Sequence, residues 1–202
     1  MMKKYNINQT TLRILWLYAG DYSRSLHLRE IARETKVDVK AVQLQLKKLE
    51  RINLLSSRLK GRNKEYYPNL SNPITKYYVI LAETFASIIY LEEHFPIKKL
   101  VAEVGKQIEG TILLFGSFVK GEVTEESDVD LLVLAEKEFD INVIREASAL
   151  INREVSVKTV SRKEFLEGLM TNDPLIMEVS SNHIILKGID DFCDIMWRYY
   201  AR

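Results

Sequence analysis

The chain has 202 residues, 47% of them hydrophobic and 28% charged, with only 8 Gly and 4 Pro. This composition excludes a disordered or low-complexity protein and provides enough apolar side chains for one domain or two small ones. The single cysteine, Cys193, excludes an internal disulfide and suits a reducing compartment. We find neither a signal-peptide pattern nor a continuous apolar run of membrane-spanning length, so we expect a cytoplasmic protein without membrane association.

Charge is divided unevenly along the chain. The net charge is +1, but residues 1–72 hold 15 Lys and Arg against 6 Asp and Glu, a balance of +9. Residues 73–202 hold the other 14 basic and 22 acidic residues, a balance of −8. A basic module joined to an acidic one indicates a nucleic-acid-binding first part and a second part with other work.

The basic part begins with three predicted helices. Residues 8–18 and 27–35 carry apolar residues at helical spacing, and Asp38 is placed to cap a third helix over 39–51. Two strands then follow, over 54–59 and 64–68. They flank the turn Lys60-Gly61-Arg62-Asn63, which predicts a basic β-hairpin.

Three helices followed by such a hairpin resemble a winged helix-turn-helix domain. The resemblance implies that residues 39–47 form the recognition helix, with Lys40 and Gln43 facing base edges, and that the hairpin is the wing. Leu44 lies on the same helix face, where a polar residue is more usual, and winged helices also serve as dimerisation or protein-docking modules. The DNA-binding residues implied are Lys40, Gln43, Lys47, Arg58, Lys60, Arg62 and Lys64.

A long apolar segment follows over residues 74–93, between Pro73 and Pro96. Its apolar content is too high for a solvated spacer, so it must pack on both modules or on a second subunit, and a homodimer is expected. We therefore divide the chain into a winged-helix domain (1–72), a connecting helix (73–96) and a second domain (97–202).

The second domain contains the most informative stretch, residues 111–134. A short buried strand is predicted over 112–115, and a second one begins where Asp128-Val129-Asp130 leads into Leu131. Two acids at i and i+2 on a strand point to one face, roughly 6–7 Å apart, and repel each other by about 2–3 kcal/mol at an effective dielectric near 20. A divalent cation with a preference for oxygen ligands, Mg²⁺ or Mn²⁺, is the usual compensation.

Gly116 and Ser117 lie between the first of these strands and a short predicted helix. Free backbone N–H groups and the helix dipole favour a phosphate at such a corner, and glycine lets the backbone approach it closely. Lys120, one turn further on, adds positive charge on the same side. A phosphate-binding turn beside paired acids is the combination of groups that phosphoryl or nucleotidyl transfer requires.

These residues resemble the DNA polymerase beta-type nucleotidyltransferase superfamily, and especially its minimal branch, where GSxxxGxxxxxSDxDLLV is typical. Gly116 to Gly121 and Ser127 to Val133 follow that pattern, with Lys120 where many members carry Arg. The resemblance implies an α+β or α/β domain with a small mixed sheet. It also implies a third metal-binding carboxylate on the strand predicted over 154–160, where Glu154 is the only acid; a surface glutamate without a ligand is the alternative.

We therefore expect a nucleotidyltransferase that transfers an NMP from an NTP, with ATP the expected one, to an unknown acceptor in a Mg²⁺-dependent reaction. Asp128, Asp130 and Glu154 are the expected metal-binding and catalytic residues; Gly116, Ser117 and Lys120 are the expected phosphate-binding residues. The alternative is a non-enzymatic, DNA-binding transcriptional regulator whose second domain senses a nucleotide. A further possibility, suggested by the family resemblance alone, is an antitoxin that modifies a partner toxin, so that a partner protein is the acceptor.

Overall fold

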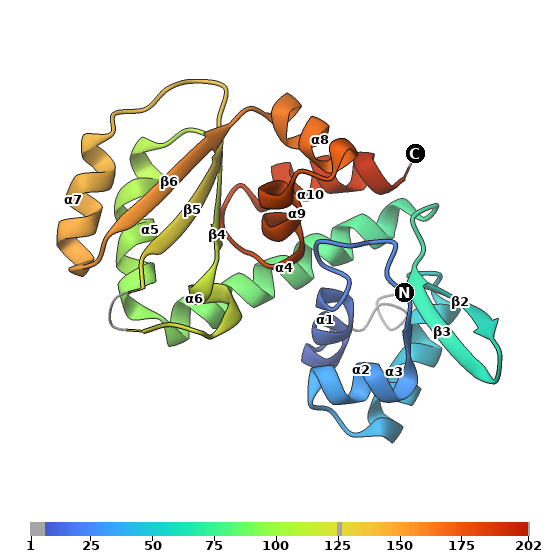
Figure 1. Cartoon of the computed structure of the whole chain (residues 1–202). Coiled ribbons are helices and arrows are strands. Elements are labelled where there is room, and N and C mark those ends of the chain that lie inside the picture. Colours follow the sequence, from blue (N-terminus) through green and yellow to red (C-terminus); the bar gives the residue numbers. More distant parts are fainter. Residues whose placement is uncertain (1–6, 125–126, 202) are drawn as a thin grey trace. The chain divides into compact units, whose positions relative to one another are not determined.

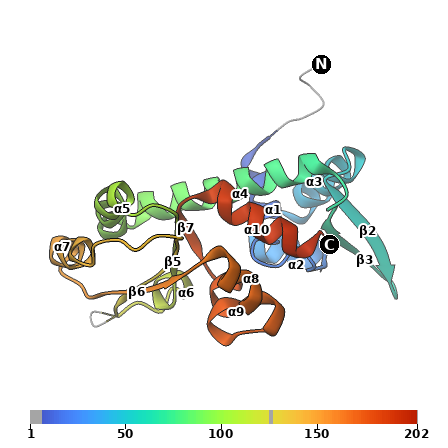
Figure 2. The ribbon, with the colours of Figure 1, turned by 90° about the horizontal axis from the view of Figure 1, so that it is seen from above.

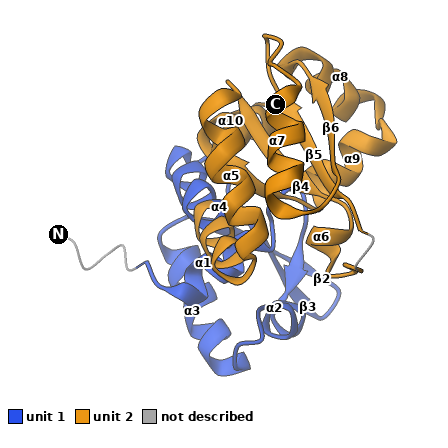
Figure 3. Cartoon of the chain, turned by 90° about the vertical axis from the view of Figure 1, so that its left-hand side faces the viewer, with its two compact units in different colours: residues 1–83, 200–202 blue, residues 84–199 orange. Residues whose placement is uncertain are grey.

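The computed structural model describes residues 7–124 and 127–201. The chain forms two compact units, residues Met1–Glu83 with Tyr200–Arg202 and residues Thr84–Tyr199, which Figure 3 colours separately. We describe each unit by itself. The domain boundaries that the sequence predicts (1–72, 73–96 and 97–202) remain a prediction.

The described residues of unit 1 form three helices, the first part of a fourth helix (α4, below) and a three-stranded antiparallel sheet of order β1-β3-β2 (Figure 1). The predicted hairpin is present: Lys60 pairs with Asn63, so Gly61 and Arg62 form the turn, and Gly61 has a φ of 61°. The two-residue strand β1 is too short to leave a periodic signal in the sequence. The elements are α1 (Gln9–Trp16), β1 (Leu26–His27), α2 (Leu28–Thr35), α3 (Val39–Arg51), β2 (Leu55–Lys60) and β3 (Asn63–Pro68).

The core of unit 1 forms where the helical stripes meet. Val42, Leu46 and Leu49 of α3, spaced four and three residues apart, are at most 1% exposed. Asp38 caps α3 by accepting hydrogen bonds from two backbone N–H groups, as predicted. The buried Gln45 donates to the Thr11 hydroxyl at 2.6 Å, which satisfies both polar groups inside the unit.

Helix α4 (Pro73–Glu93) is 21 residues long and continues from unit 1 into unit 2. Tyr78 and Ala82 belong to the core of unit 1, and Ser87 donates a hydrogen bond of 2.7 Å to the Ile185 carbonyl in unit 2. By length and composition alone this helix could cross a membrane, although the sequence contains no continuous apolar run of that length. Lys76 and Glu83 interrupt any continuous apolar run, yet the mean hydropathy stays high; a core helix passes the same test.

Unit 2 is built on a four-stranded sheet of order β6-β5-β4-β7. Strands β5 and β6 pair in parallel, whereas β4 is antiparallel to both β5 and β7, so the expected small mixed sheet is confirmed. The elements are α5 (Phe95–Gln107), β4 (Thr111–Phe115), α6 (Ser117–Lys120), β5 (Val129–Leu134), α7 (Asn142–Ile151), β6 (Val155–Val160), α8 (Arg162–Thr171), α9 (Pro174–Ser181), β7 (Ile184–Lys187) and α10 (Ile189–Tyr200).

The sheet of unit 2 is covered on both faces, as Figures 1 and 2 show. Helices α5 and α7 pack on the face of Val129, Leu131 and Val133, and all three side chains are fully buried. The other face lies toward α8, α9 and α10, where Phe165 and Phe192 pack edge to face. Because both faces are covered, β4 and β5 read as continuous apolar runs rather than as alternating ones.

Two glycines of unit 2 should respond in opposite ways to alanine. At Gly110, with a φ of 123°, a Cβ would lie 2.1 Å from the Leu134 carbonyl oxygen, so we expect Gly110→Ala to destabilise the fold by about 2 kcal/mol or more. Gly105 is helical, and its Cβ would meet only Val101 Cγ1 at 4.0 Å, so Gly105→Ala should stabilise by up to about 1 kcal/mol. Urea unfolding of both variants measures the difference; equal effects would contradict the backbone geometry.

Candidate functional site

The corner between β4 and α6 is formed by Gly116. Its φ of 72° is a conformation that favours glycine, and the backbone N–H groups of Val119 and Lys120 donate to its carbonyl at 3.1 Å. A Cβ on Gly116 would lie 2.5 Å from Asp130 Oδ2. Glycine is thus required there for its backbone conformation and for its contact with the acid, which brings the two halves of the sequence motif together.

Helix α6 is anchored by its neighbours in unit 2. Phe118 is 7% exposed, and its carbonyl accepts a hydrogen bond of 3.1 Å from the Tyr90 hydroxyl. Burial raises the pKa of Tyr90 to about 12, so this hydroxyl remains a donor at neutral pH. The burial of Phe118 and the hydrogen bond from Tyr90 therefore fix the helix that follows the Gly116-Ser117 corner.

Asp130 lies on β5 opposite Phe115 of β4, and its side chain is half-buried. Burial raises the pKa of Asp130, the charges of Asp128 and Glu178 raise it further, and the Lys158 ammonium lowers it. Asp128, two residues earlier, is exposed. The structure thus brings together the two acids, Gly116 and, through Asp130, a third carboxylate that the sequence analysis did not propose.

The segment that leads into Asp128 is held by Arg153. Its guanidinium donates to the carbonyl oxygens of Thr124 and Ser127 at 3.0 and 2.9 Å and lies 5.5 Å from the centre of the Phe118 ring. Sequence reasoning missed this role because an arginine before a strand carries no signal of its distant partners. The arginine therefore links the start of β5 to α6.

Strand β6 lies beside β5 and supplies the next side chains. Asp130 pairs in register with Ser156, and Lys158 is close enough to act on the Asp130 charge. Glu154 immediately precedes β6 and is exposed; its carbonyl accepts a hydrogen bond of 2.9 Å from the N–H of Val129. The backbone of Glu154 is thus next to the start of β5, whereas the position directly beside Asp130 holds a hydroxyl.

Lys120, the predicted phosphate-binding cation, pairs with Glu178 of α9. Its Nζ lies 2.6 Å from Glu178 Oε1, and this hydrogen bond raises the pKa of Lys120. The sequence analysis did not propose Glu178 as a site residue, because nothing in one sequence links it to the Gly-Ser motif. The one signal was present in the sequence: Glu178 is the only charged residue of the helix PLIMEVSS.

Metal binding at this site must rest on few protein ligands. In the described ranges no three His, Cys, Asp or Glu side chains form a group that could hold a metal ion. Two carboxylates, Asp128 and Asp130, nevertheless share the donor chemistry that Mg²⁺ prefers, and Mg²⁺ is commonly bound by one or two carboxylates together with substrate phosphates. The residues fit an ion that arrives with a nucleotide better than one held by the protein alone.

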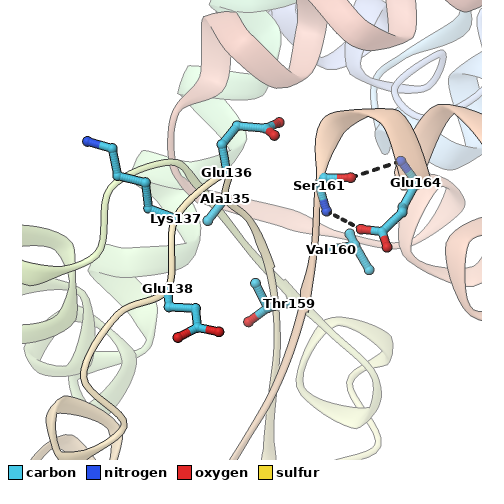
Figure 4. A pocket seen from close by; sticks show the side chains of 8 residues that line it. All are labelled: Ala135, Glu136, Lys137, Glu138, Thr159, Val160, Ser161 and Glu164. Atoms are coloured by element: carbon cyan, nitrogen blue, oxygen red, sulfur yellow. Dashed lines mark hydrogen bonds between the residues drawn. The ribbon is translucent and has the colours of Figure 1, made fainter.

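A hollow of about 190 Å³ lies near the C-terminal ends of β5 and β6 (Figure 4). Ser161 and Glu164 in its wall bond each other reciprocally, Glu164 N to Ser161 Oγ at 3.1 Å and Ser161 N to Glu164 Oε2 at 2.7 Å. This is the capping box of α8. Its polar groups serve the helix start, and the hollow lies away from Asp130 at the other end of β5.

Unit 1 contains a larger hollow, of about 580 Å³, between α2, α3 and the hairpin. Three of the predicted DNA-binding residues, Gln43, Arg62 and Lys64, line it together with Arg29. Lys40 and Lys47 are exposed on α3. The other two have acidic neighbours, since Arg58 Nε and Lys60 Nζ each lie 3.5 Å from a Glu65 oxygen.

A mixed sheet with a glycine-serine corner beside paired aspartates defines a nucleotidyltransferase-type domain. Residues 97–185 match the model of the nucleotidyltransferase domain family, and the chain belongs to this family. A candidate protein adenylyltransferase of Methanocaldococcus jannaschii is 31% identical over 85 residues, which cover 33% of this chain and 85% of that protein. A crystal structure of a toxin–antitoxin with AMP-PNP is similar at 18% identity, with a TM-score of 0.36, covering 50% of this chain and 82% of that one.

The raised pKa of Asp130 predicts that this acid destabilises the fold when it is ionised. A folded-state pKa above the unfolded value means that stability is lost as pH rises through the window between the two. We expect Asp130→Asn to raise the Tm at pH 7.5, and the gain to shrink as the pH is lowered toward the ordinary carboxyl range. Thermal melts of metal-free protein at pH 7.5 and 5 test this, with Glu146→Gln on α7 as control; a lower Tm at pH 7.5 contradicts it.

Proposed function

We propose that unit 2 transfers a nucleoside monophosphate from an NTP to an acceptor hydroxyl. The observation that carries the proposal is the contact between the Gly116-Ser117 corner and the Asp130 carboxylate, with Lys120 one turn away. This arrangement offers backbone N–H groups and a cation to phosphate oxygens beside carboxylates that suit a divalent ion. Family membership and the relative support nucleotidyl transfer in general.

Each proposed residue has one task. Gly116 and Ser117 hold phosphate oxygens, and Lys120 offsets their charge. Asp128 and Asp130 would hold Mg²⁺ or Mn²⁺, which when bound supplies charge stabilisation for the entering and leaving oxygens. Glu154 completes the acidic set and takes the proton from the acceptor hydroxyl as its oxygen bonds to the α-phosphorus and pyrophosphate leaves.

Removal of one carboxylate tests this chemistry directly. We expect Asp130→Asn to lower NMP transfer from labelled ATP by at least about 100-fold, as loss of a main electrostatic group does, while Glu146→Gln keeps wild-type activity. Label transfer and pyrophosphate release in the presence of Mg²⁺ are the measurements. Binding of Mg²⁺ and ATP by the wild type without pyrophosphate release would favour the alternative, a nucleotide sensor that regulates transcription.

We propose ATP as the nucleotide and a protein side chain as the acceptor. The relative from Methanocaldococcus jannaschii bears the name of a protein adenylyltransferase, and that name supports both choices. A partner protein, rather than a nucleic acid, is therefore the acceptor proposed.

We further propose that unit 1 is a winged-helix domain that binds DNA. The support is the hollow between α3 and the hairpin, which collects Gln43, Arg62 and Lys64 on one surface. Basic side chains at such a surface meet phosphates, and Lys40 and Gln43 are placed on the exposed face of α3 for base edges. The exposed Leu44 suits contact with a thymine methyl group.

A loss of charge at the hairpin should weaken DNA binding without regard to sequence. We expect Arg62→Ala to reduce affinity for duplex DNA and to lower the slope of log affinity against log salt by about 1, because one phosphate contact is lost. Arg145→Ala on α7 removes the same charge from unit 2 and should leave the slope unchanged. Fluorescence anisotropy at several salt concentrations gives both values; equal slopes for the two variants count against the wing.

A homodimer remains a proposal that α4 supports. Tyr77 and Ile88 are 65% and 54% exposed on this helix, and Phe95 beyond it is 63% exposed. Apolar side chains exposed along a helix favour contact with another apolar surface. A cytoplasmic location without membrane association is likewise proposed, on the single cysteine and the charged residues of α4.

A further inference from the structure

The ion pair between Lys120 and Glu178 lies at the edge of the candidate site. Lys120 Nζ and Glu178 Oε1 are 2.6 Å apart, and the two side chains are 40% and 37% exposed. Ile176 and Val179, on either side of Glu178 in α9, are at most 4% exposed. The backbone of Glu178 is thus fixed by buried neighbours while its carboxylate reaches out to the lysine.

Stabilisation of the contact between α6 and α9 does not by itself explain the ion pair between Lys120 and Glu178. Ion pairs of such exposure contribute about 0–1 kcal/mol, and α6 is already held by the buried Phe118 and by the Tyr90 hydrogen bond. The position of Glu178 also has a disadvantage, because its negative charge acts on Asp130, which already has Asp128 nearby. A third negative charge beside two others calls for a role that involves the ligand.

The chemistry of Lys120 supplies that role. An ammonium group is a compact charge that binds a carboxylate or a phosphate oxygen in the same way. Lys120 lies at the end of α6, one turn after the Gly116-Ser117 corner. In the free protein, the carboxylate of Glu178 is therefore the hydrogen-bond acceptor of this ammonium group.

We propose that Glu178 is an internal competitor of the nucleotide: its carboxylate occupies on Lys120 the place that a triphosphate oxygen takes in the complex. This inference rests on the proposed function of unit 2. Nucleotide binding then requires the Lys120–Glu178 pair to open, and the released carboxylate remains near Asp130, where a divalent ion bound with the nucleotide would offset its charge.

The test is the affinity for ATP without divalent ions. We expect Glu178→Gln to bind ATP in EDTA about two- to fivefold more tightly than the wild type at low ionic strength, which corresponds to roughly 0.4–1 kcal/mol. The gain should fade at high salt, since the pair is exposed. In the Lys120→Met background the gain should shrink, because the competed cation is absent.

Glu109→Gln is the matched control. Glu109 pairs with Lys137 at 3.0 Å on the surface of unit 2 and precedes the start of β4, the opposite end of that strand from Gly116. Its substitution removes the same charge and should leave ATP affinity unchanged. Glu178→Asp, which shortens the side chain, should shift affinity in the same direction as Glu178→Gln, and thermal melts verify that each variant is folded.

Three results overturn the inference. Affinity of Glu178→Gln equal to or weaker than wild type shows that Glu178 does not compete, and an undiminished gain in the Lys120→Met background shows that Lys120 is not the shared partner. In both cases the wild type still binds ATP, so the proposed function stands. A wild type that binds no ATP, with or without Mg²⁺, removes the proposed function and this inference together.

Discussion

The contact between Gly116 and the Asp130 carboxylate is the constraint on which the site depends. The antiparallel register of β4 and β5 sets Phe115 opposite Asp130, so the turn after β4 must pass directly over that side chain. A Cβ at residue 116 would lie 2.5 Å from Asp130 Oδ2, and the φ of 72° also disfavours any other residue. The glycine and the acid of the motif are thus one structural feature, because each is defined by the position of the other.

This constraint concentrates negative charge where the fold would be more stable without it. Asp130 is half-buried beside Asp128 and within reach of the Glu178 charge, and its raised pKa reflects both burial and repulsion. Lys158 and Lys120 offset part of the charge from β6 and α6. The ligand that we propose, a metal-bound triphosphate, carries both a cation and an anion and so complements carboxylates and lysines together.

Structural features that depend on residues close together in the sequence could be predicted, whereas contacts between distant segments could not. Helix α3 with its cap at Asp38, the hairpin around Gly61 and the strand β4 were confirmed, because each depends on residues a few positions apart. The mixed sheet was predicted only through the family resemblance. The contacts of Glu178 and Arg153 with the site were not found, since pairings between distant segments leave no periodic pattern in one sequence.

Unit 1 also contains lysines and arginines that pair with glutamates, as Lys120 does with Glu178 in unit 2. Glu65 lies between Arg58 and Lys60 on the hairpin, and its side chain is only 14% exposed; Glu50 bonds Lys64 at 2.9 Å. The excess of +9 over residues 1–72 therefore overstates the charge that the hairpin presents to a ligand. In both units, basic side chains that we propose to contact phosphates are paired with carboxylates. Where both partners are partly exposed, as at Lys120 and Glu178, such an ion pair is weak enough for a polyanion to displace.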